Sequence, residues 1–388
     1  MTEPLTVSDP PVPRAQHARR QGRWGPALWD NAFPVGLFAV VDLAILVAVR
    51  LQPASGRSEF SWWHGDSGIY LWIVNSGYSL NRCGAGYPAG SWCGNTGWQP
   101  LYPWLIKTFT LTGANETAVA VVLSQACTLA VFVLLWQIIG PVRHRKVVMV
   151  TAAVFPGIIY YFTLFPISLL ILLALVLFKL LASGRYRWAL IPAFLIPLSY
   201  SSAVVVIVVL GLWLLAFRRL QDWRPVALVL AASAAGYVVF LAVLKITVGT
   251  WRAEYLVQAK YGNGLHNPLK TLFTLTAPTP GRFVGSGDVV ALQTQLVLLI
   301  MIVLTYVVYD NRARLTSLDQ LVVCWTYVFW FTPLVVGLGI SSYRSNALLL
   351  PAVVLFRYMN RALLIPLIVL SAPVAYLLAI PVLTGKLV

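Results

Sequence analysis

Long apolar stretches separated by short polar loops are the feature that most constrains what this chain can fold into. A helix needs about 20 apolar residues to cross the ~30 Å hydrocarbon core of a membrane. With 59% hydrophobic and 10% charged residues and a mean hydropathy of +0.79, the chain has too little polar surface for a soluble globule of 388 residues. The sequence therefore predicts an all-α polytopic membrane protein with about 11 transmembrane helices. The expected spans cover residues 32–49, 114–139, 147–164, 167–181, 188–217, 226–247, 289–309, 318–340, 347–356 and 363–383.

Two of these spans contain residues that need a separate interpretation. The stretch 188–217 holds Pro192, Pro197 and a polar run from Ser199 to Ser202, so we expect two short helices that meet inside the bilayer region. Asp42 interrupts the first span. We expect it to be a packing residue with a partner inside the bundle.

The distribution of basic residues indicates the orientation in the membrane. Lys and Arg outnumber Asp and Glu by 28 to 12, but they are spread through short loops, which points to topology and not to nucleic-acid binding. The amino-terminal tail and every second connection carry 17 of the 28, so that side is cytoplasmic by the positive-inside rule. We expect a multi-pass cell-membrane protein whose residues 1–26 form a disordered cytoplasmic tail. The long loops 52–113 and 248–288 then lie on the extracytoplasmic face.

The first of these exterior loops is expected to hold one or two short surface helices, because a structureless loop of that length is uncommon. Cys83 and Cys93 lie in it, and we expect a disulfide between them, since the exterior compartment permits one. Four scattered histidines and no Cys-x-x-Cys pair predict no metal site. No phosphate-binding glycine motif is present, so no cofactor is expected.

Asp66 stands in a dense run of aromatic residues and glycines near the start of the same loop. A carboxylate at the membrane surface, beside His64, is a candidate for acid–base chemistry on a lipid-borne substrate. The alternative is structural: Asp66 or Ser67 caps an interfacial helix, and the neighbouring tryptophans anchor it.

Cationic and polar side chains in the other exterior turns complement this carboxylate. Arg and Lys near the headgroup layer suit a phosphate, which Arg binds through two parallel hydrogen bonds. Ordinary contact with anionic lipid headgroups is equally open for each of them. The candidates are Arg252, Gln258, Lys260, Tyr261, His266 and Lys270 in the second loop, and Arg344 in a third exterior turn.

Two segments of the first loop carry recognisable motifs. Residues Asp66 to Tyr78 read Asp-x-x-x-Tyr-Leu-x-Ile-x-x-x-Gly-Tyr, and Trp98 to Leu105 read Trp-Gln-Pro-Leu-Tyr-Pro-Trp-Leu. The first resembles the same pattern in the PIG-V-like mannosyltransferases, polytopic enzymes of the GT-C class, and the second is similar to their Phe-Phe-Pro-Leu-Tyr-Pro segment. Weaker similarities are Phe155-Pro156-Gly157 with Tyr160, and Gln258, Tyr261, Asn267 and Pro268.

The chain also departs from that family in two places. His64 and Gly65 separate Trp63 from Asp66, whereas the family usually has Trp directly before the Asp. The family's Tyr-Ser-Glu-Ser is absent, and Phe165-Pro166-Ile167-Ser168 stands in its place.

The resemblance implies a GT-C-like transmembrane domain over residues 27–388 and an inverting transfer of a sugar, usually mannose. The donor is a polyprenyl-phosphate sugar and the acceptor a lipid-linked or envelope glycan outside the cytoplasm. Asp66 corresponds to the family's proposed base, and we expect His64 or His266 to assist or orient it. Departing phosphate can be stabilised by Arg and Lys without a metal. We expect Arg344, Lys260 and Arg252 to bind the donor phosphate, Tyr261 and Gln258 to contact the sugar, and the motif residues Tyr70, Gln99 and Tyr102 to line the substrate site.

A transporter or flippase for lipids or lipid-linked sugars is the alternative class. It predicts internal repeats and charged residues along a transmembrane path. Neither is evident in the sequence, because the spans carry little charge beyond Asp42. A scaffold subunit without activity is a third reading, in which Asp66 would be dispensable.

Overall fold

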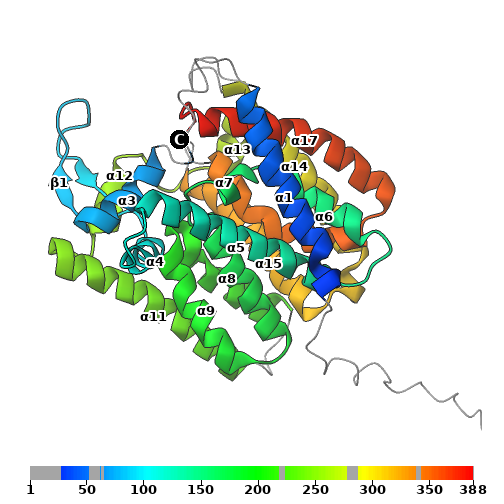
Figure 1. Cartoon of the computed structure of the whole chain (residues 1–388). Coiled ribbons are helices and arrows are strands. Elements are labelled where there is room, and N and C mark those ends of the chain that lie inside the picture. The colour runs from blue at the N-terminus through cyan, green and yellow to red at the C-terminus, as the bar shows by residue number, and fades with distance from the viewer. Residues whose placement is uncertain are drawn as a thin grey trace, which may run out of the picture.

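The computed structural model describes residues 28–51, 62, 65–217, 223–277, 287–337 and 342–387, and in them the chain is almost wholly helical (Figure 1). Five helices are long and apolar enough to cross a membrane, and three shorter apolar helices accompany them. The all-α membrane class is therefore confirmed, whereas the predicted number of spans is not. The five are α5 (Glu116–Ile139), α11 (Trp223–Val248), α14 (Gly287–Asp310), α15 (Ser317–Val336) and α17 (Arg361–Leu383); the shorter ones are α1 (Ala32–Arg50), α8 (Ile167–Ala182) and η3 (Ser201–Val205) continued by α10 (Val206–Ala216).

The predicted span 147–164 is interrupted. It consists of α6 (Arg145–Ala153) and the short α7 (Ile159–Phe162). Pro156 lacks a backbone N–H and cannot continue the helix, and Gly157 takes a positive φ of 95°. A Cβ on Gly157 would lie 3.0 Å from the Cβ of Ala347, so the break also lets two backbones approach closely.

The predicted span 347–356 is not among the long apolar helices. It is the middle of η6 (Asn346–Tyr358), a 3₁₀-helix of 13 residues in which all residues from Asn346 to Phe356 are buried in protein. Runs of 3₁₀-helix rarely exceed four residues, so this one depends on the helices around it. Hydropathy alone does not separate a core helix from a span, and a run this short more often lies in a core.

The predicted break in 188–217 is confirmed. The helix α9 (Tyr186–Ser199) ends before Tyr200, whose backbone is extended, and the chain resumes in η3. The same helix packs along α11 through Gly236, where a Cβ would come within 2.1 Å of the carbonyl oxygen of Phe194. Small residues at such crossings let helix backbones approach closely.

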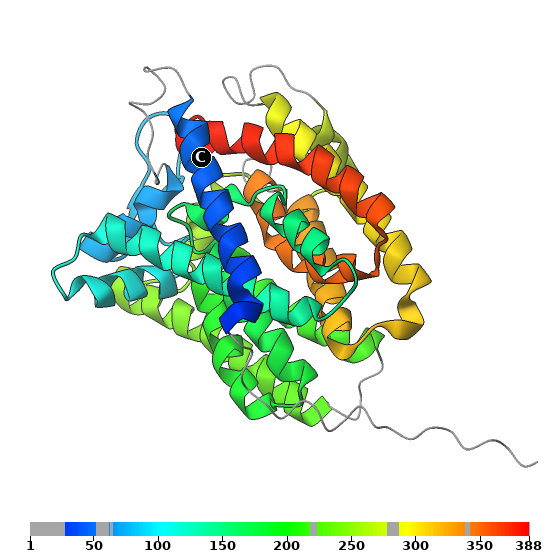
Figure 2. The same ribbon diagram turned by 45° about the vertical axis from the view of Figure 1, so that its right-hand side comes forward.

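The first helix, α1, lies across α5 and also contacts α6 and α17 (Figure 2). Asp42 on α1 is half-buried, and the side-chain amide of Gln125 donates to it at 3.5 Å. The expected packing role of Asp42 fits this contact.

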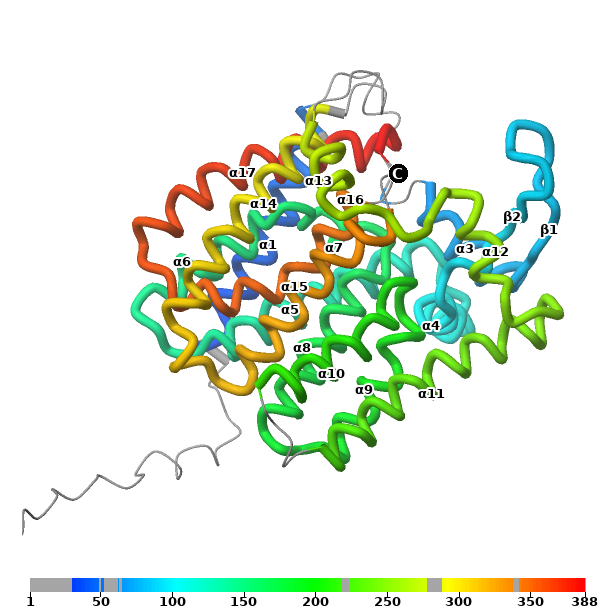
Figure 3. Tube along the Cα trace, turned by 180° about the vertical axis from the view of Figure 1, so that it is seen from behind, coloured from blue at the N-terminus to red at the C-terminus, as the bar shows by residue number. Residues whose placement is uncertain are grey.

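The described parts of the two long loops, 52–113 and 248–288, contain short helices, as predicted for the first loop. A β-hairpin that the sequence did not suggest lies between two of these helices, and the expected disulfide between Cys83 and Cys93 closes it. Figure 3 shows these elements gathered at one end of the bundle. They are α3 (Asp66–Ser76), β1 (Leu80–Arg82), β2 (Trp92–Gly94), α4 (Leu101–Thr110), α12 (Ala253–Ala259) and α13 (Pro268–Thr276).

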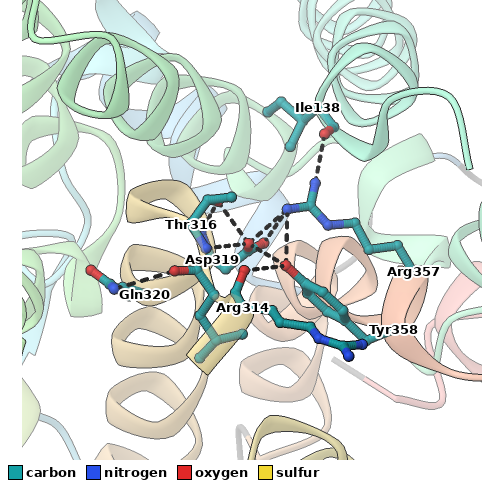
Figure 4. Close-up of polar contacts among 8 residues, drawn as sticks. Ile138, Arg314, Thr316, Asp319, Gln320, Arg357 and Tyr358 are labelled. Carbon is teal, nitrogen blue, oxygen red and sulfur yellow. Dashed lines mark hydrogen bonds and ion pairs between the residues drawn. The ribbon is translucent and has the colours of Figure 1, made fainter. Parts of the chain in front are cut away.

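A buried ion pair joins η6 to the start of α15 (Figure 4). Asp319 is fully buried and accepts from Arg357 Nη2 at 2.8 and 2.6 Å. The hydroxyl of Tyr358 and the backbone N–H of Thr316 each add a bond of 2.8 Å to Asp319. The network therefore fixes the carboxyl-terminal end of η6 against the start of α15.

Candidate active site

Asp66 is the first residue of α3, and its side chain does not cap that helix. The capping position is Gly65, with a φ of 50° and no side-chain cap bond. The carboxylate of Asp66 instead forms an ion pair with Arg344 Nη1. Its side chain is 24% exposed, so it is open to solvent on one side. The structural alternative for Asp66, an N-cap, is therefore wrong, because the carboxylate turns away from the helix end toward α16 (Ser342–Ser345).

Arg344 is the buried member of this pair, with 8% of its side chain exposed. Its guanidinium carbon lies 5.6 Å from the ring centroid of Phe165 and 5.8 Å from that of Tyr343. Burial would lower the pKa of Arg344, but the Asp66 carboxylate outweighs burial and raises that pKa above its ordinary value. The site therefore holds a permanent cation beside a carboxylate, from segments 278 positions apart in the chain.

Buried tyrosines surround the ion pair. Tyr160 stacks on Tyr343 at 6.1 Å, and Tyr70 meets Phe165 edge to face at 6.3 Å. Burial raises the pKa of Tyr343 to about 12, with Arg344 lowering it and Asp66 raising it. Burial also raises the pKa of Tyr70. Both hydroxyls stay protonated at neutral pH, so they are hydrogen-bonding groups and not bases.

Lys260 and Tyr261 from the second loop reach the same region. The Nζ of Lys260 lies 3.6 Å from Cys93 Sγ and 4.8 Å from the ring centroid of Tyr261. Burial lowers the pKa of Lys260, and the charge of Asp66 opposes that change. Burial raises the pKa of Tyr261, and Asp66 raises it further. Both side chains therefore lie within electrostatic reach of the Asp66 carboxylate.

Tyr102 and Gln99, also expected to line the substrate site, are structural instead. Tyr102 is fully buried, and its hydroxyl bonds to Ala120 O and Ser124 Oγ, each at 2.7 Å. Gln99 is 1% exposed, and its amide donates to Glu254 at 3.0 Å. Because these groups are enclosed and engaged with other helices, they fix α4 in place and present no surface to a ligand.

Three of the remaining predicted residues lie apart from the contacts of the Asp66–Arg344 pair. His266 packs its ring against Gly337, where a Cβ would come within 2.2 Å of the ring, and its Nε2 lies 3.1 Å from Gly262 O. Gln258 packs against Gly97, and Arg252 is exposed at the start of α12. No contact in the described structure joins these three to Asp66. His64 lies outside the described residues.

Glu254 is a half-buried acid that no pattern in the sequence singles out. It accepts from Gln99 and, at 2.9 Å, from the hydroxyl of Tyr237. Burial raises its pKa to about 7, although both hydrogen bonds act in the opposite direction. Its shielding from solvent depends on α12 packing against β2 and α11, which no local sequence pattern reports.

Within the described part of the chain, no three His, Cys, Asp or Glu side chains gather where they could hold a metal ion. The groups around Asp66 are instead a buried guanidinium, an ammonium and tyrosine hydroxyls. Such a set suits an anionic group with an oxygen-rich, partly apolar body, as in a lipid phosphate that carries a sugar.

No family model matches the chain, and no curated protein is similar to it in sequence.

Proposed function

We propose that this chain is a membrane glycosyltransferase that moves a sugar from a polyprenyl-phosphate donor to a hydroxyl of a lipid-linked or envelope-glycan acceptor. The observation that carries the proposal is the partly exposed Asp66 carboxylate paired with the buried Arg344. Lys260 stands within electrostatic reach of the same carboxylate. One base and two cations at one place are what a transfer with a departing phosphate needs.

The chemistry balances with these groups alone. The acceptor oxygen attacks the anomeric carbon, and the bond from that carbon to the phosphate oxygen breaks. The acceptor proton passes to Asp66, and polyprenyl phosphate leaves with the electron pair of the broken bond. A single displacement of this kind inverts the anomeric configuration.

The ion pair gives the donor phosphate a role in activating the base. In the ion pair, a carboxylate oxygen of Asp66 accepts from Arg344 Nη1 and is not free to accept from an acceptor hydroxyl. A phosphate bound by Arg344 and Lys260 competes with Asp66 for the positive charge. Donor binding therefore frees Asp66 to accept a proton, so the base acts only when the donor is in place.

The sugar and the side of the membrane are further parts of this proposal. Mannose is the sugar that the resemblance to the PIG-V-like family favours. The exterior location of the site is supported by the basic residues in the opposite loops. Tyr261, exposed on the second loop, is placed to contact the sugar.

The test is a two-arm assay with purified protein in liposomes. One arm supplies polyprenyl-phosphate sugars labelled with mannose, glucose, galactose or arabinose together with envelope glycolipids, and follows label in the acceptor by mass spectrometry. The other arm follows movement of labelled lipid between the leaflets. Transfer of one sugar without lipid movement supports the proposal. Lipid movement without transfer supports a flippase and contradicts it.

A further inference from the structure

A narrow slot opens beside the Asp66–Arg344 pair. It lies between the first turn of α3, α7 and the carboxyl-terminal end of α17, and its free space of about 10 Å³ admits one water-sized group. A whole sugar ring does not fit, but one hydroxyl group does. The slot is lined by Trp62, Ser67, Tyr160, Thr163, Phe165, Val382 and Leu387.

Two hydroxyls in this slot lack hydrogen-bond partners among the described residues: those of Ser67 and Tyr160. Each of these side chains is 1% exposed. A buried hydroxyl without a partner destabilises a fold by about 1–3 kcal/mol. Two of them at one slot indicate that an oxygen of a bound molecule completes their hydrogen bonds.

The position of the Tyr160 hydroxyl is fixed by the residues that form the active site. Its ring stacks on Tyr343 and meets Phe165 edge to face at 5.6 Å. The guanidinium of Arg344 lies over both of those rings. Ser67 follows Asp66 directly on α3. The slot therefore has a fixed position relative to the Asp66 carboxylate, which is proposed as the base.

We propose that this slot binds a second hydroxyl of the acceptor, next to the one that reacts, and that the acceptor is accordingly a polyol such as a sugar headgroup. This inference rests on the proposed function for the role of Asp66. The Tyr160 hydroxyl donates to the acceptor oxygen, and that oxygen donates its own proton to Ser67 Oγ. The apolar walls, Phe165, Val382 and Leu387, exclude ions and select a carbon-bound hydroxyl.

The first experiment measures binding without transfer. Isothermal titration of octyl mannoside into the protein in nanodiscs is compared with octanol, which has one hydroxyl. We expect Tyr160→Phe to weaken octyl mannoside binding at least 10-fold and Ser67→Ala to weaken it by a smaller factor. Thr163→Val is the matched control, because Thr163 lines the same slot but its hydroxyl already donates to Ile159 O. It should leave the affinity unchanged.

The second experiment measures transfer with the same variants. Tyr160→Phe should raise the acceptor KM with the donor KM unchanged, and its thermal stability should equal or exceed wild type, because the change removes an unsatisfied buried hydroxyl. Equal affinity of wild type and Tyr160→Phe for octyl mannoside, or octanol binding as tightly as octyl mannoside, would overturn the slot assignment. If the wild type transfers no sugar but the variants change octyl mannoside binding as expected, the proposed function is overturned. The assignment of the slot as a hydroxyl-binding site is then still supported.

Discussion

Replacing Arg344 by glutamine separates the contribution of the Asp66–Arg344 pair to folding from its contribution to phosphate binding. The change removes the guanidinium and leaves Asp66 without its ion-pair partner. Breaking a fully buried ion pair costs about 3–5 kcal/mol, because a charge is left without compensation. Here water already reaches the remaining carboxylate, which is 24% exposed. We therefore expect a loss of about 2 kcal/mol in the free energy of unfolding.

The control is the same substitution at the other end of η6. Arg357→Gln leaves Asp319, which is fully buried, without the two bonds of 2.8 and 2.6 Å from the guanidinium. Since no solvent reaches that carboxylate, the full cost of about 3–5 kcal/mol applies. The control should lower the thermal midpoint more than Arg344→Gln does, although it lies far from the proposed site.

The assay combines thermal unfolding in detergent with titration of polyprenyl phosphate below the midpoint of both variants. A hydrogen bond to a charged group contributes about 1.5–3 kcal/mol, so Arg344→Gln should weaken phosphate binding roughly 10- to 100-fold. Arg357→Gln should bind as wild type does. Unchanged affinity in Arg344→Gln, or a larger loss of stability there than in Arg357→Gln, would refute this reasoning.

Three further predictions follow from the packing and from the buried groups. Gly236→Ala should destabilise the protein by about 1–3 kcal/mol, because the added Cβ would meet the carbonyl oxygen of Phe194. The control is Gly211→Ala, where the added Cβ would meet open space. That variant should be neutral or slightly stabilising in thermal melts. The pKa of Glu254 is raised to about 7, so stability should fall as pH rises from about 4.5 through 7; Glu254→Gln should abolish that trend, and an unchanged pH profile would show that another group causes it. Replacing both Cys83 and Cys93 by serine should lower the free energy of unfolding by about 2–3 kcal/mol. It should also reduce donor affinity, because Lys260 lies against Cys93. An unchanged donor affinity in this variant would show that the hairpin does not position Lys260.

The sequence predicted the membrane class because apolar runs of the right length are a local signal. The sequence did not predict the features that depend on how other segments pack around a run. The run 347–356 was predicted as a span, but it forms a buried 3₁₀-helix that is not among the five long apolar helices. Pro156 and Gly157 break another run that hydropathy shows as continuous. The break before Tyr200 was predictable since Pro and Ser residues mark it in the sequence itself.

The candidate site was also predicted only in part, because residue types are visible in the sequence whereas the packing between segments is not. Asp66, Arg344 and Lys260 were singled out by residue type and expected side of the membrane; the structure pairs Asp66 with Arg344, and the charge of Asp66 influences Lys260. Tyr102 and Gln99 lie in a motif, but whether a motif residue faces a ligand or another helix depends on packing. The buried Asp319 and the half-buried Glu254 escaped notice because burial of a carboxylate is set by distant segments.

The measurement that tests the central claim most directly is the initial rate of sugar transfer from polyprenyl-phosphate mannose by wild type and Asp66→Asn in nanodiscs. Asparagine keeps the shape of the side chain but cannot take a proton from the acceptor. Loss of a general base slows a reaction by about 10²- to 10⁴-fold, so the account predicts a loss of that size in a variant that remains folded. Asp66→Asn turning over at the wild-type rate would contradict it.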